Sequence, residues 1–399
     1  MIYTADYLFT AKDAPIRNGY VECGEGGEVL SYGVYDPVKH SGKPVVKCRG
    51  FLVPGFANAH CHLELSYLEG MFRQGTGMDG FIKQINELRT AVGPEARQKA
   101  IRDSLDSLIS QGVTCMGDIS NCDETFAVKE EKSDLIFTRS FLEVFGTEPE
   151  DARQILESAV KLQNKAASMG LQAAPAPHSC YTMSPLLNRL AAAKGLESGY
   201  ISYHSQESVE EEDMLRYGTG PLAEDYRSRG TTQLPVTGTG ALEYFLDNLS
   251  EAVDMPVRGN VLLVHNVALD QESIDIALRR LKNPYWVLCP LSNIFIHRAL
   301  PPVGLMRKNG LKICVGTDSL SSNTVLSPVA ELKCLQDNFP DVPLSEMIGW
   351  ACFNGAEAIG CSGRMGSIEE GKTPGIVLIS EVDVENIRLT GKSRSTRLV

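Results

Sequence analysis

Short apolar runs alternate with amphipathic stretches through most of the chain. Apolar residues recur at helical spacing in residues 95–111 and 151–169. Short apolar runs between such stretches end in polar or unusual residues and predict eight strands, at residues 52–57, 113–118, 136–143, 171–175, 200–203, 261–264, 286–289 and 312–316. Strands that alternate with helices predict an α/β fold, for which we expect a closed parallel (β/α)8 TIM barrel. A doubly wound open sheet is the alternative.

Both ends of the chain have a different pattern. Residues 2–10 and 20–23 alternate between apolar and polar side chains, with turn residues at 24–27 and 36–37. Near the other end, residues 375–379 are again apolar and β-branched. We therefore expect the two ends, residues 1–52 and 366–399, to pair into one small β domain. The barrel would occupy residues 53–365.

Composition narrows the class of protein. The 399 residues carry a formal net charge of −12, which argues against nucleic acid or an anionic membrane as partner. The 11 cysteines include no Cys-x-x-Cys pair, so a disulfide framework is not expected. No signal peptide and no apolar run of about 18 residues is evident. We expect a cytoplasmic protein that acts on a small molecule; a homodimer is a further expectation that no motif tests.

The histidines carry the strongest chemical signal. There are only seven, and most follow a predicted strand, where the barrel would bring them to one face. His60 and His62 come first, and alternate residues of a strand point to the same side. Such a pair can chelate zinc or a similar metal. A chance pair with structural hydrogen bonds is the alternative.

Three more residues would complete a metal site with an acid beside it. His204 follows the fifth strand, and Asp318 ends the last one. Three histidines and one aspartate leave a coordination position for water, as a catalytic site requires. Glu207, three residues beyond His204, could move a proton between water and a leaving group. The alternatives are a helix N-cap for Asp318 and a surface glutamate for Glu207.

Other strand-end residues are candidates with less certain roles. His265 follows the sixth strand and could bind metal, polarise the attacking water or be a hydrogen-bonded core histidine. His178 ends the fourth strand and could contact substrate or cap a helix. Glu64 is a further candidate for the pocket, and the acidic run at 208–213 reads as a solvated helix start. The remaining candidate substrate contacts are Arg139, Glu143, Ser292, Asn293 and Ser319.

Three other chemistries find no support. The chain has no Gly-x-x-x-x-Gly-Lys loop for phosphate and no Gly-x-Ser-x-Gly nucleophile elbow. Its glycine-rich stretch at 24–27 does not link a strand to a helix in the dinucleotide-binding pattern. The strand-end histidines and Asp318 instead favour a metal-dependent hydrolase.

These motifs together resemble the amidohydrolase superfamily, in the branch of nucleobase and nucleoside deaminases and triazine chlorohydrolases. The matching segments occur in the family's order over nearly the whole chain: PGFANAHCH, APHSCYTMSP, YHSQES, VHN, CPLSN and GTDS. One departure is Gly371-Lys-Thr-Pro-Gly375, where the family usually has Gly-Lys-x-Ala-Asp. It falls in the terminal domain, away from the chemistry. The segment HLELS after Cys61 is similar to aminofutalosine deaminases.

The resemblance implies one divalent metal ion, zinc above iron or manganese, on four ligands: His60, His62, His204 and Asp318. It also implies proton-transfer or water-activating roles for Glu207 and His265, and contact between His178 and a purine-like substrate. Many relatives with two metals carry a lysine near the end of the fourth strand, where this chain has His178 instead. The resemblance further implies that the terminal domain is a β-sandwich.

The predicted function is therefore hydrolytic deamination of a purine-like nitrogen heterocycle, with 6-aminodeoxyfutalosine or an adenosine derivative as the lead. In this hypothesis Asp318 and His265 orient the attacking water and take its proton, while Glu207 protonates the ring nitrogen beside the attacked carbon. The same residues could cleave another C–N bond or a carbon–halogen bond. A non-catalytic ligand-binding barrel is the remote alternative, because it would require that one or more of the metal ligands be missing.

Overall fold

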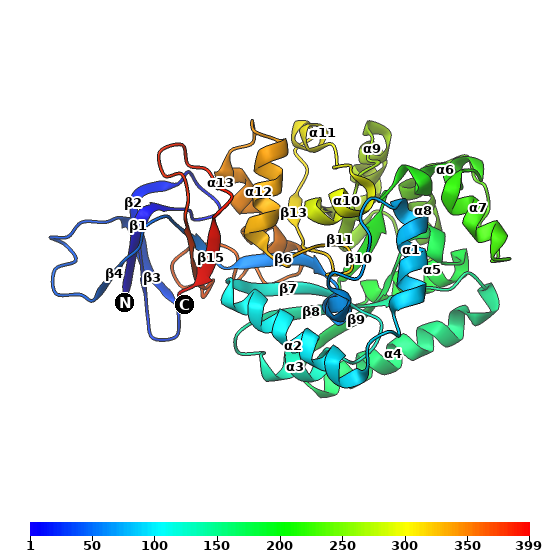
Figure 1. Ribbon diagram of the computed structural model, residues 1–399, viewed down its shortest axis with the longest axis horizontal. Coiled ribbons are helices and arrows are strands. Elements are labelled where there is room, and N and C mark those ends of the chain that lie inside the picture. Colours follow the sequence, from blue (N-terminus) through cyan, green and yellow to red (C-terminus); the bar gives the residue numbers. More distant parts are fainter.

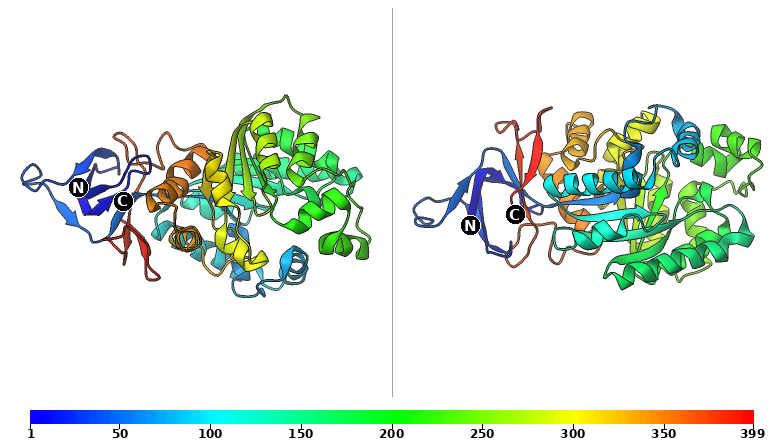
Figure 2. Two further views of the ribbon diagram at one scale, coloured as in Figure 1. Left: turned by 90° about the horizontal axis from the view of Figure 1, so that it is seen from above. Right: turned by 60° about the horizontal axis from the view of Figure 1, so that its bottom comes forward.

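The computed structural model describes residues 1–399 and has two visibly different parts (Figure 1). A sheet made from both chain ends lies at one end of the molecule, where the N- and C-termini are close together. An α/β body with helices around parallel strands forms the rest, and Figure 2 shows the same division from two other directions. No helix is long and apolar enough to span a membrane.

The α/β body contains two four-stranded parallel sheets, which account for all eight predicted strands. The first sheet has the order β6 (Phe56–Cys61), β7 (Val113–Ser120), β8 (Phe137–Val144) and β9 (Gln172–Pro177). The second has the order β10 (Tyr200–Ser205), β11 (Val257–His265), β12 (Leu281–Leu288) and β13 (Ile313–Val315). In both sheets neighbours in space are also neighbours in sequence, because a helical segment returns the chain between successive strands.

The two sheets meet at the carboxyl ends of their strands. The amide of His204, on β10, donates to the carbonyl of His178, just after β9, at 2.9 Å. On the other side an isolated parallel bridge pairs Cys61 of β6 with Asp318 beyond β13. These contacts are local, and no continuous ladder joins the sheets into a closed ring. The structure therefore has the expected α/β class with parallel strands.

The helices cover the outer side of the parallel strands. Two of them, α2 (Pro94–Ser110) and α4 (Ala152–Ser168), correspond to the predicted amphipathic stretches. Because the strands are buried on both faces, their sequences read as apolar runs. The other α-helices are α1 (Gly77–Leu88), α3 (Phe126–Glu131), α5 (Pro185–Leu196), α6 (Val209–Tyr217), α7 (Gly220–Ser228), α8 (Ala241–Ser250), α9 (Gln271–Arg280), α10 (Pro290–His297), α11 (Val303–Lys308), α12 (Pro328–Asn338), α13 (Leu344–Gly349) and α14 (Gly355–Ala358).

The first predicted strand proves to be two strands separated by Gly55. β5 (Phe51–Pro54) belongs to the terminal sheet, and β6 starts the α/β body at Phe56. A Cβ atom at Gly55 would lie 2.4 Å from the carbonyl oxygen of Pro374 and 2.4 Å from Oγ1 of Thr114. Only glycine lets the backbone pass at this distance. The predicted strand at 52–57 was therefore wrong in its bounds.

The chain ends pair as the sequence predicted, but within one sheet. Its order is β15 (Arg394–Arg397), β14 (Ile376–Ser380), β5, β1 (Ile2–Leu8), β2 (Ile16–Cys23) and β3 (Val29–Val34), while β4 (Val45–Lys47) pairs with β1. The antiparallel pairing of β14 with β5 connects the two ends. Since hydrogen bonds connect all seven strands, the two separate sheets of a sandwich are not seen.

Candidate active site

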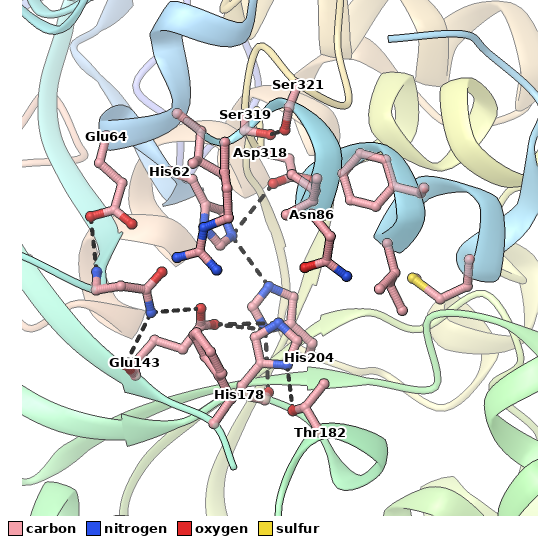
Figure 3. Close-up of a pocket in the computed structure, with 18 of the residues that line it drawn as sticks. His62, Glu64, Asn86, Glu143, His178, Thr182, His204, Asp318, Ser319 and Ser321 are labelled. Carbon is pink, nitrogen blue, oxygen red and sulfur yellow. Dashed lines mark hydrogen bonds and ion pairs between the residues drawn. The ribbon is translucent and has the colours of Figure 1, made fainter. Parts of the chain in front are cut away.

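Four predicted ligands meet at the carboxyl ends of the parallel strands. The ligand atoms of His60, His62 and His204 all lie within 4.8 Å of one another. Asp318 joins them, with Oδ1 3.8 Å from Nε2 of His60 and 3.6 Å from Nε2 of His62. Figure 3 shows His62, His204 and Asp318 pointing toward one another. Residues from both sheets thus surround one point.

His60 provides the clearest test of whether these residues fit a metal ion. Its side chain is fully buried, and neither ring nitrogen has a hydrogen-bond partner. Burial lowers the pKa of His60 well below its ordinary value. A buried neutral imidazole with two unpaired nitrogens is costly, and coordination of a cation through one nitrogen would remove part of that cost. The donor set of three imidazoles and one carboxylate fits a divalent ion such as zinc.

Neighbouring groups orient two of the ligands. Nδ1 of His204 lies 3.2 Å from the carbonyl oxygen of His178, so it donates there and leaves Nε2 as the free donor atom toward the site. On Asp318, Oδ2 accepts hydrogen bonds from the hydroxyls of Ser292 at 2.6 Å and Ser322 at 2.8 Å. Oδ1 is therefore the oxygen left to face the histidines.

The backbone at Asp318 is held in an unusual conformation. Its φ of 55° lies in the left-handed region, which a non-glycine residue adopts at some cost. Asn58 compensates by bonding Thr317 twice: its Oδ1 accepts from the Thr317 amide at 3.0 Å, and its Nδ2 donates to Oγ1 at 2.8 Å. The strained turn directs the Asp318 carboxylate toward the site. Burial would raise the pKa of this carboxyl, but the nearby imidazoles, His62 first, hold it below its ordinary value.

Glu207 and His265 face each other beside this centre. Oε1 of Glu207 lies 3.5 Å from Nε2 of His265. Burial, followed by the negative charge of Asp318, raises the pKa of Glu207 well above its ordinary value, which favours a protonated carboxyl. Burial lowers the pKa of His265 to about 4 and keeps the ring neutral. Asn293 Nδ2 lies 3.0 Å from Nδ1 of that ring and fixes its orientation. The arrangement can therefore supply a proton from Glu207 and a neutral imidazole.

The acidic run at 208–213 is not simply solvated, as the sequence suggested. It opens α6, where Ser208 accepts a hydrogen bond from the Glu211 amide at 3.2 Å. Glu211 is fully buried, and its Oε2 accepts from the backbone amide of Glu207 at 2.8 Å. Ser208 with Glu211 three residues later has the spacing of a capping box, and this signal could have predicted the burial. Glu211 thereby fixes the backbone that carries Glu207.

A cavity of about 470 Å³ opens onto these residues, a size suited to a small-molecule ligand. His178, Glu143 and Ser319 line it, as expected of substrate contacts. Burial lowers the pKa of His178 to about 3. Its Nδ1 is 2.8 Å from Oγ1 of Thr182, so the ring is held with Nε2 on the other side. These positions are compatible with contact between His178 and a bound ligand.

Three other predicted substrate contacts do not line the cavity. Ser292 and Asn293 are fully buried behind it, where they bond Asp318 and His265. Arg139 lies near the amino end of β8 and therefore far along the strand from its carboxyl end. Its guanidinium donates to the carbonyl of Ile359 at 2.8 Å and covers the ring of Tyr200. The prediction failed for Arg139 because assigning a residue to a strand does not show whether it lies near the carboxyl end, where the site is.

The sequence reasoning missed several polar lining residues, Asn121 among them, and one whole apolar wall. Asn121 directly follows β7, a position at a strand end that could have revealed it. The apolar wall comes from α1, which contributes the lining residues Met78, Phe81, Ile82 and Ile85. No local signal indicates that this helix packs over the site, because its docking depends on distant partners.

Comparison with known proteins gives consistent matches. A family model described as the amidohydrolase family matches residues 51–395. An adenosine deaminase of Helicobacter pylori is 28% identical over 330 residues, covering 80% of this chain and 76% of that protein. An aminodeoxyfutalosine deaminase of Nitratiruptor sp. is 27% identical over 337 residues, covering 82% and 78%. The solved aminofutalosine deaminase of Helicobacter pylori in complex with methylthio-coformycin superimposes with a TM-score of 0.77 at 24% identity, covering 96% of this chain and 92% of that one.

Proposed function

We propose, from the premise that this chain belongs to the amidohydrolase family, that it is a metal-dependent hydrolase that deaminates a purine-like nitrogen heterocycle. The observation that carries the proposal is the meeting of a buried three-histidine, one-aspartate donor set with Glu207 in one cavity. The names of the similar proteins, adenosine deaminase and aminodeoxyfutalosine deaminase, support this reaction for a purine-like ring. An adenosine derivative or 6-aminodeoxyfutalosine is the proposed substrate.

We further propose that the two parallel sheets are the halves of a (β/α)8 barrel spanning residues 53–365. The eight strands follow in sequence order, and hydrogen bonds connect the sheets on both sides at their carboxyl ends. Residues 1–52 and 366–399 then form the terminal domain. The fold shared with the solved aminofutalosine deaminase supports this interpretation.

His60, His62, His204 and Asp318 would hold a single divalent ion, which we propose to be zinc. When bound, such an ion supplies Lewis acidity, which makes water a usable nucleophile at neutral pH. A second group of potential ligands, Glu143, His178 and His204, shares His204 with the first. Because Nδ1 of His204 is already close to the His178 carbonyl, this second group is not proposed to hold an ion.

Three residues orient the attacking water and carry the proton transfers in this proposal. Asp318 accepts a hydrogen bond from the water and takes its proton. The neutral His265, whose Nδ1 accepts from Asn293, would orient the water by donating through its Nε2–H. Glu207, protonated because of its burial, donates its proton to the ring nitrogen beside the amino-bearing carbon. The proton that Asp318 took from the water can then pass to the departing amino group, which leaves as ammonia, while the Glu207 carboxylate regains a proton from the hydroxyl group that becomes the carbonyl. His178, which lines the cavity, would contact the substrate ring.

The test is an ammonia-release screen with zinc-loaded protein. The panel contains adenosine, 5′-methylthioadenosine, S-adenosylhomocysteine, 6-aminodeoxyfutalosine, adenine, guanine and cytosine. Chloride release from a chlorinated triazine is measured beside it. We expect ammonia from at least one adenosine derivative and none from the demetallated protein. Release of chloride alone, or no ammonia from any adenosine derivative, would contradict the proposal and favour the alternative hydrolase.

A further inference from the structure

Glu331, on α12, is a fully buried acid bonded to the two segments that support Asp318. Its side chain has no exposed surface, it does not line the cavity, and the proposed mechanism does not use it. A carboxyl group that is removed from water must be held by hydrogen bonds, because burying it without them is costly. The partners of Glu331 therefore show what it holds in place.

Each carboxyl oxygen of Glu331 binds a different segment. Oε2 accepts from the backbone amide of Leu291 at 2.9 Å. Leu291 lies in the first turn of α10, where amides have no partner within the helix, and the N-cap residue Cys289 provides none from its side chain. Oε1 accepts from Nδ2 of Asn323 at 2.8 Å, and that nitrogen also donates to the Thr317 carbonyl at 2.9 Å. One carboxyl group thus connects the start of α10, after β12, with the loop after β13.

Both segments lead directly to the candidate site. The next residue of α10 is Ser292, whose hydroxyl donates to Oδ2 of Asp318 at 2.6 Å. It is followed by Asn293, whose Nδ2 lies 3.0 Å from Nδ1 of His265. In the other segment Thr317 directly precedes Asp318. Glu331 therefore stands one step behind the contacts that orient a proposed metal ligand and the imidazole beside it.

The two bonds require an acceptor at both ends of the side chain. Leu291 presents a backbone amide and Asn323 a side-chain NH₂, and neither group can accept. Burial raises the pKa of Glu331 well above its ordinary value, although both bonds oppose this shift. Neutral or charged, both carboxyl oxygens can accept, whereas the amide nitrogen of a glutamine cannot. Asn323 cannot reverse its own amide without losing the bond that its Oδ1 accepts from the Thr324 amide at 2.7 Å. Glutamine at position 331 must therefore give up a bond without a change of size.

We propose that Glu331 is a positioning residue that connects the β12 and β13 ends of the site, keeps Ser292 in register with Asp318, and thereby sets the affinity for the metal ion. It acts through the orientation of the Asp318 carboxylate and touches neither the ion nor the substrate. The inference rests on the proposed function, of which it uses only the metal site. Residues that hold a metal ligand from outside generally affect binding in this way.

The test compares metal affinity with stability in the same variants. Competition with a chromogenic chelator gives the affinity for zinc, and urea unfolding of the metal-free protein gives the stability. Glu331→Gln should lower the affinity for zinc about 10-fold, near the lower end of the effect of outer contacts, because Glu331 acts through Ser292. Asn323→Ala breaks the same connection from its other end and should lower the affinity in the same direction.

A double-mutant cycle distinguishes positioning from a general weakening of the protein. If Glu331 acts through Ser292, the double variant Glu331→Gln with Ser292→Ala should lose less affinity for zinc than the product of the two single losses. Losses that simply multiply would show that the two residues act independently and would overturn the inference.

The matched control is Gln336→Met on the same helix. Gln336 is buried, and its side chain exchanges hydrogen bonds of 2.9 and 3.0 Å with the backbone of Leu389, away from the cavity. This variant should lower stability and leave the affinity for zinc unchanged. Glu87→Gln, an exposed glutamate of α1 that does not line the cavity, should change neither quantity.

Two results would refute the positioning role: unchanged affinity in both Glu331→Gln and Asn323→Ala, or an equal loss of affinity in Gln336→Met. If ammonia is released by the wild-type protein while these variants keep full affinity, the proposed function stands and this inference falls. If affinity falls as expected but no substrate is deaminated, the inference stands and the proposed deamination falls.

Discussion

The backbone amide of Asp318 donates to the carbonyl oxygen of His60 at 3.0 Å. This bond joins the first parallel strand to the segment that follows the last one. The amide of Thr317 donates to the same carbonyl, also at 3.0 Å. A Cβ atom at Gly316 would lie 2.8 Å from Cβ of His60, so the close approach of the two segments requires glycine there. The geometry of two proposed ligands therefore depends on one backbone contact.

We expect the purified protein to bind one divalent ion per chain, and activity to follow its content. His60→Ala should abolish stoichiometric binding, because His60 is the buried ligand without any other partner. Chelation should remove activity, and zinc should restore it. Elemental analysis of the dialysed protein, with iron and manganese tested in parallel, measures this. Two ions per chain would instead implicate the group Glu143, His178 and His204.

Glu207→Gln should keep the metal and lose turnover. The amide has nearly the same shape but cannot deliver the proton, so kcat should fall by roughly 10²- to 10⁴-fold. Steady-state kinetics and metal analysis on the same sample separate the two effects. As a control, Glu87→Gln should match the wild-type protein in both measurements. Unchanged turnover in Glu207→Gln would refute the proton-transfer role.

Ser292→Ala should weaken the site without touching substrate. Ser292 and Ser322 both bond Oδ2 of Asp318, so either alanine variant removes one of two bonds that orient the carboxylate. Loss of such an outer contact typically lowers metal affinity by roughly 10- to 100-fold. Competition with a chromogenic chelator gives the affinity. If Ser292 contacts substrate instead, the variant will raise KM and leave metal affinity unchanged.

The chemistry of the site could be predicted from sequence better than its surroundings. His60, His62, His204 and Asp318 follow strands, and the shared edge of parallel strands brings such positions together whatever separates them in the chain. The eight strands could also be predicted, because strands that are buried on both faces appear in the sequence as apolar runs. The break at Gly55 could not be found, because it depends on the distant backbone at Pro374.

The substrate wall and the supporting residues were harder to predict. Ser292 and Asn293 follow a strand, as the true wall residues do, and only packing shows that they point behind the cavity. Helix α1 covers the site through contacts with elements far away in sequence. Glu211 looked like a surface acid because its neighbours are charged, although the N-cap spacing indicated otherwise.

The buried Glu211 carboxyl should make the free energy of unfolding decrease as the pH rises. Burial raises its pKa to about 8, whereas an exposed glutamate titrates near about 4.3. The stability linked to this proton is fully present below the lower value and is lost as pH rises toward the upper one, because the unfolded chain releases the proton first. Glu211→Gln removes this dependence. Thermal unfolding should show that Glu211→Gln is more stable, relative to the wild-type protein, at pH 8 than at pH 5. An equal difference in stability at both pH values would contradict the assignment.

The buried pair of Asp118 and Lys129 should couple stability to metal binding. Both side chains are fully buried and form an ion pair, and Lys129 also donates to Ser140 at 2.7 Å. Asp118 Oδ1 accepts from the amide of Leu63, directly after His62, at 2.9 Å. Lys129→Met leaves a buried carboxylate without its partner, which should cost about 3–5 kcal/mol of unfolding free energy and weaken metal binding through the displaced Leu63 amide.

Urea unfolding of the metal-free protein and a metal titration of the folded protein measure these two effects separately. The double variant Asp118→Leu with Lys129→Met removes both charges and should recover much of the stability, because no unpaired charge remains. It should not recover metal affinity, because leucine cannot accept the hydrogen bond from Leu63. Recovery of both quantities would mean that the pair acts on the fold alone and that the position of His62 does not depend on it.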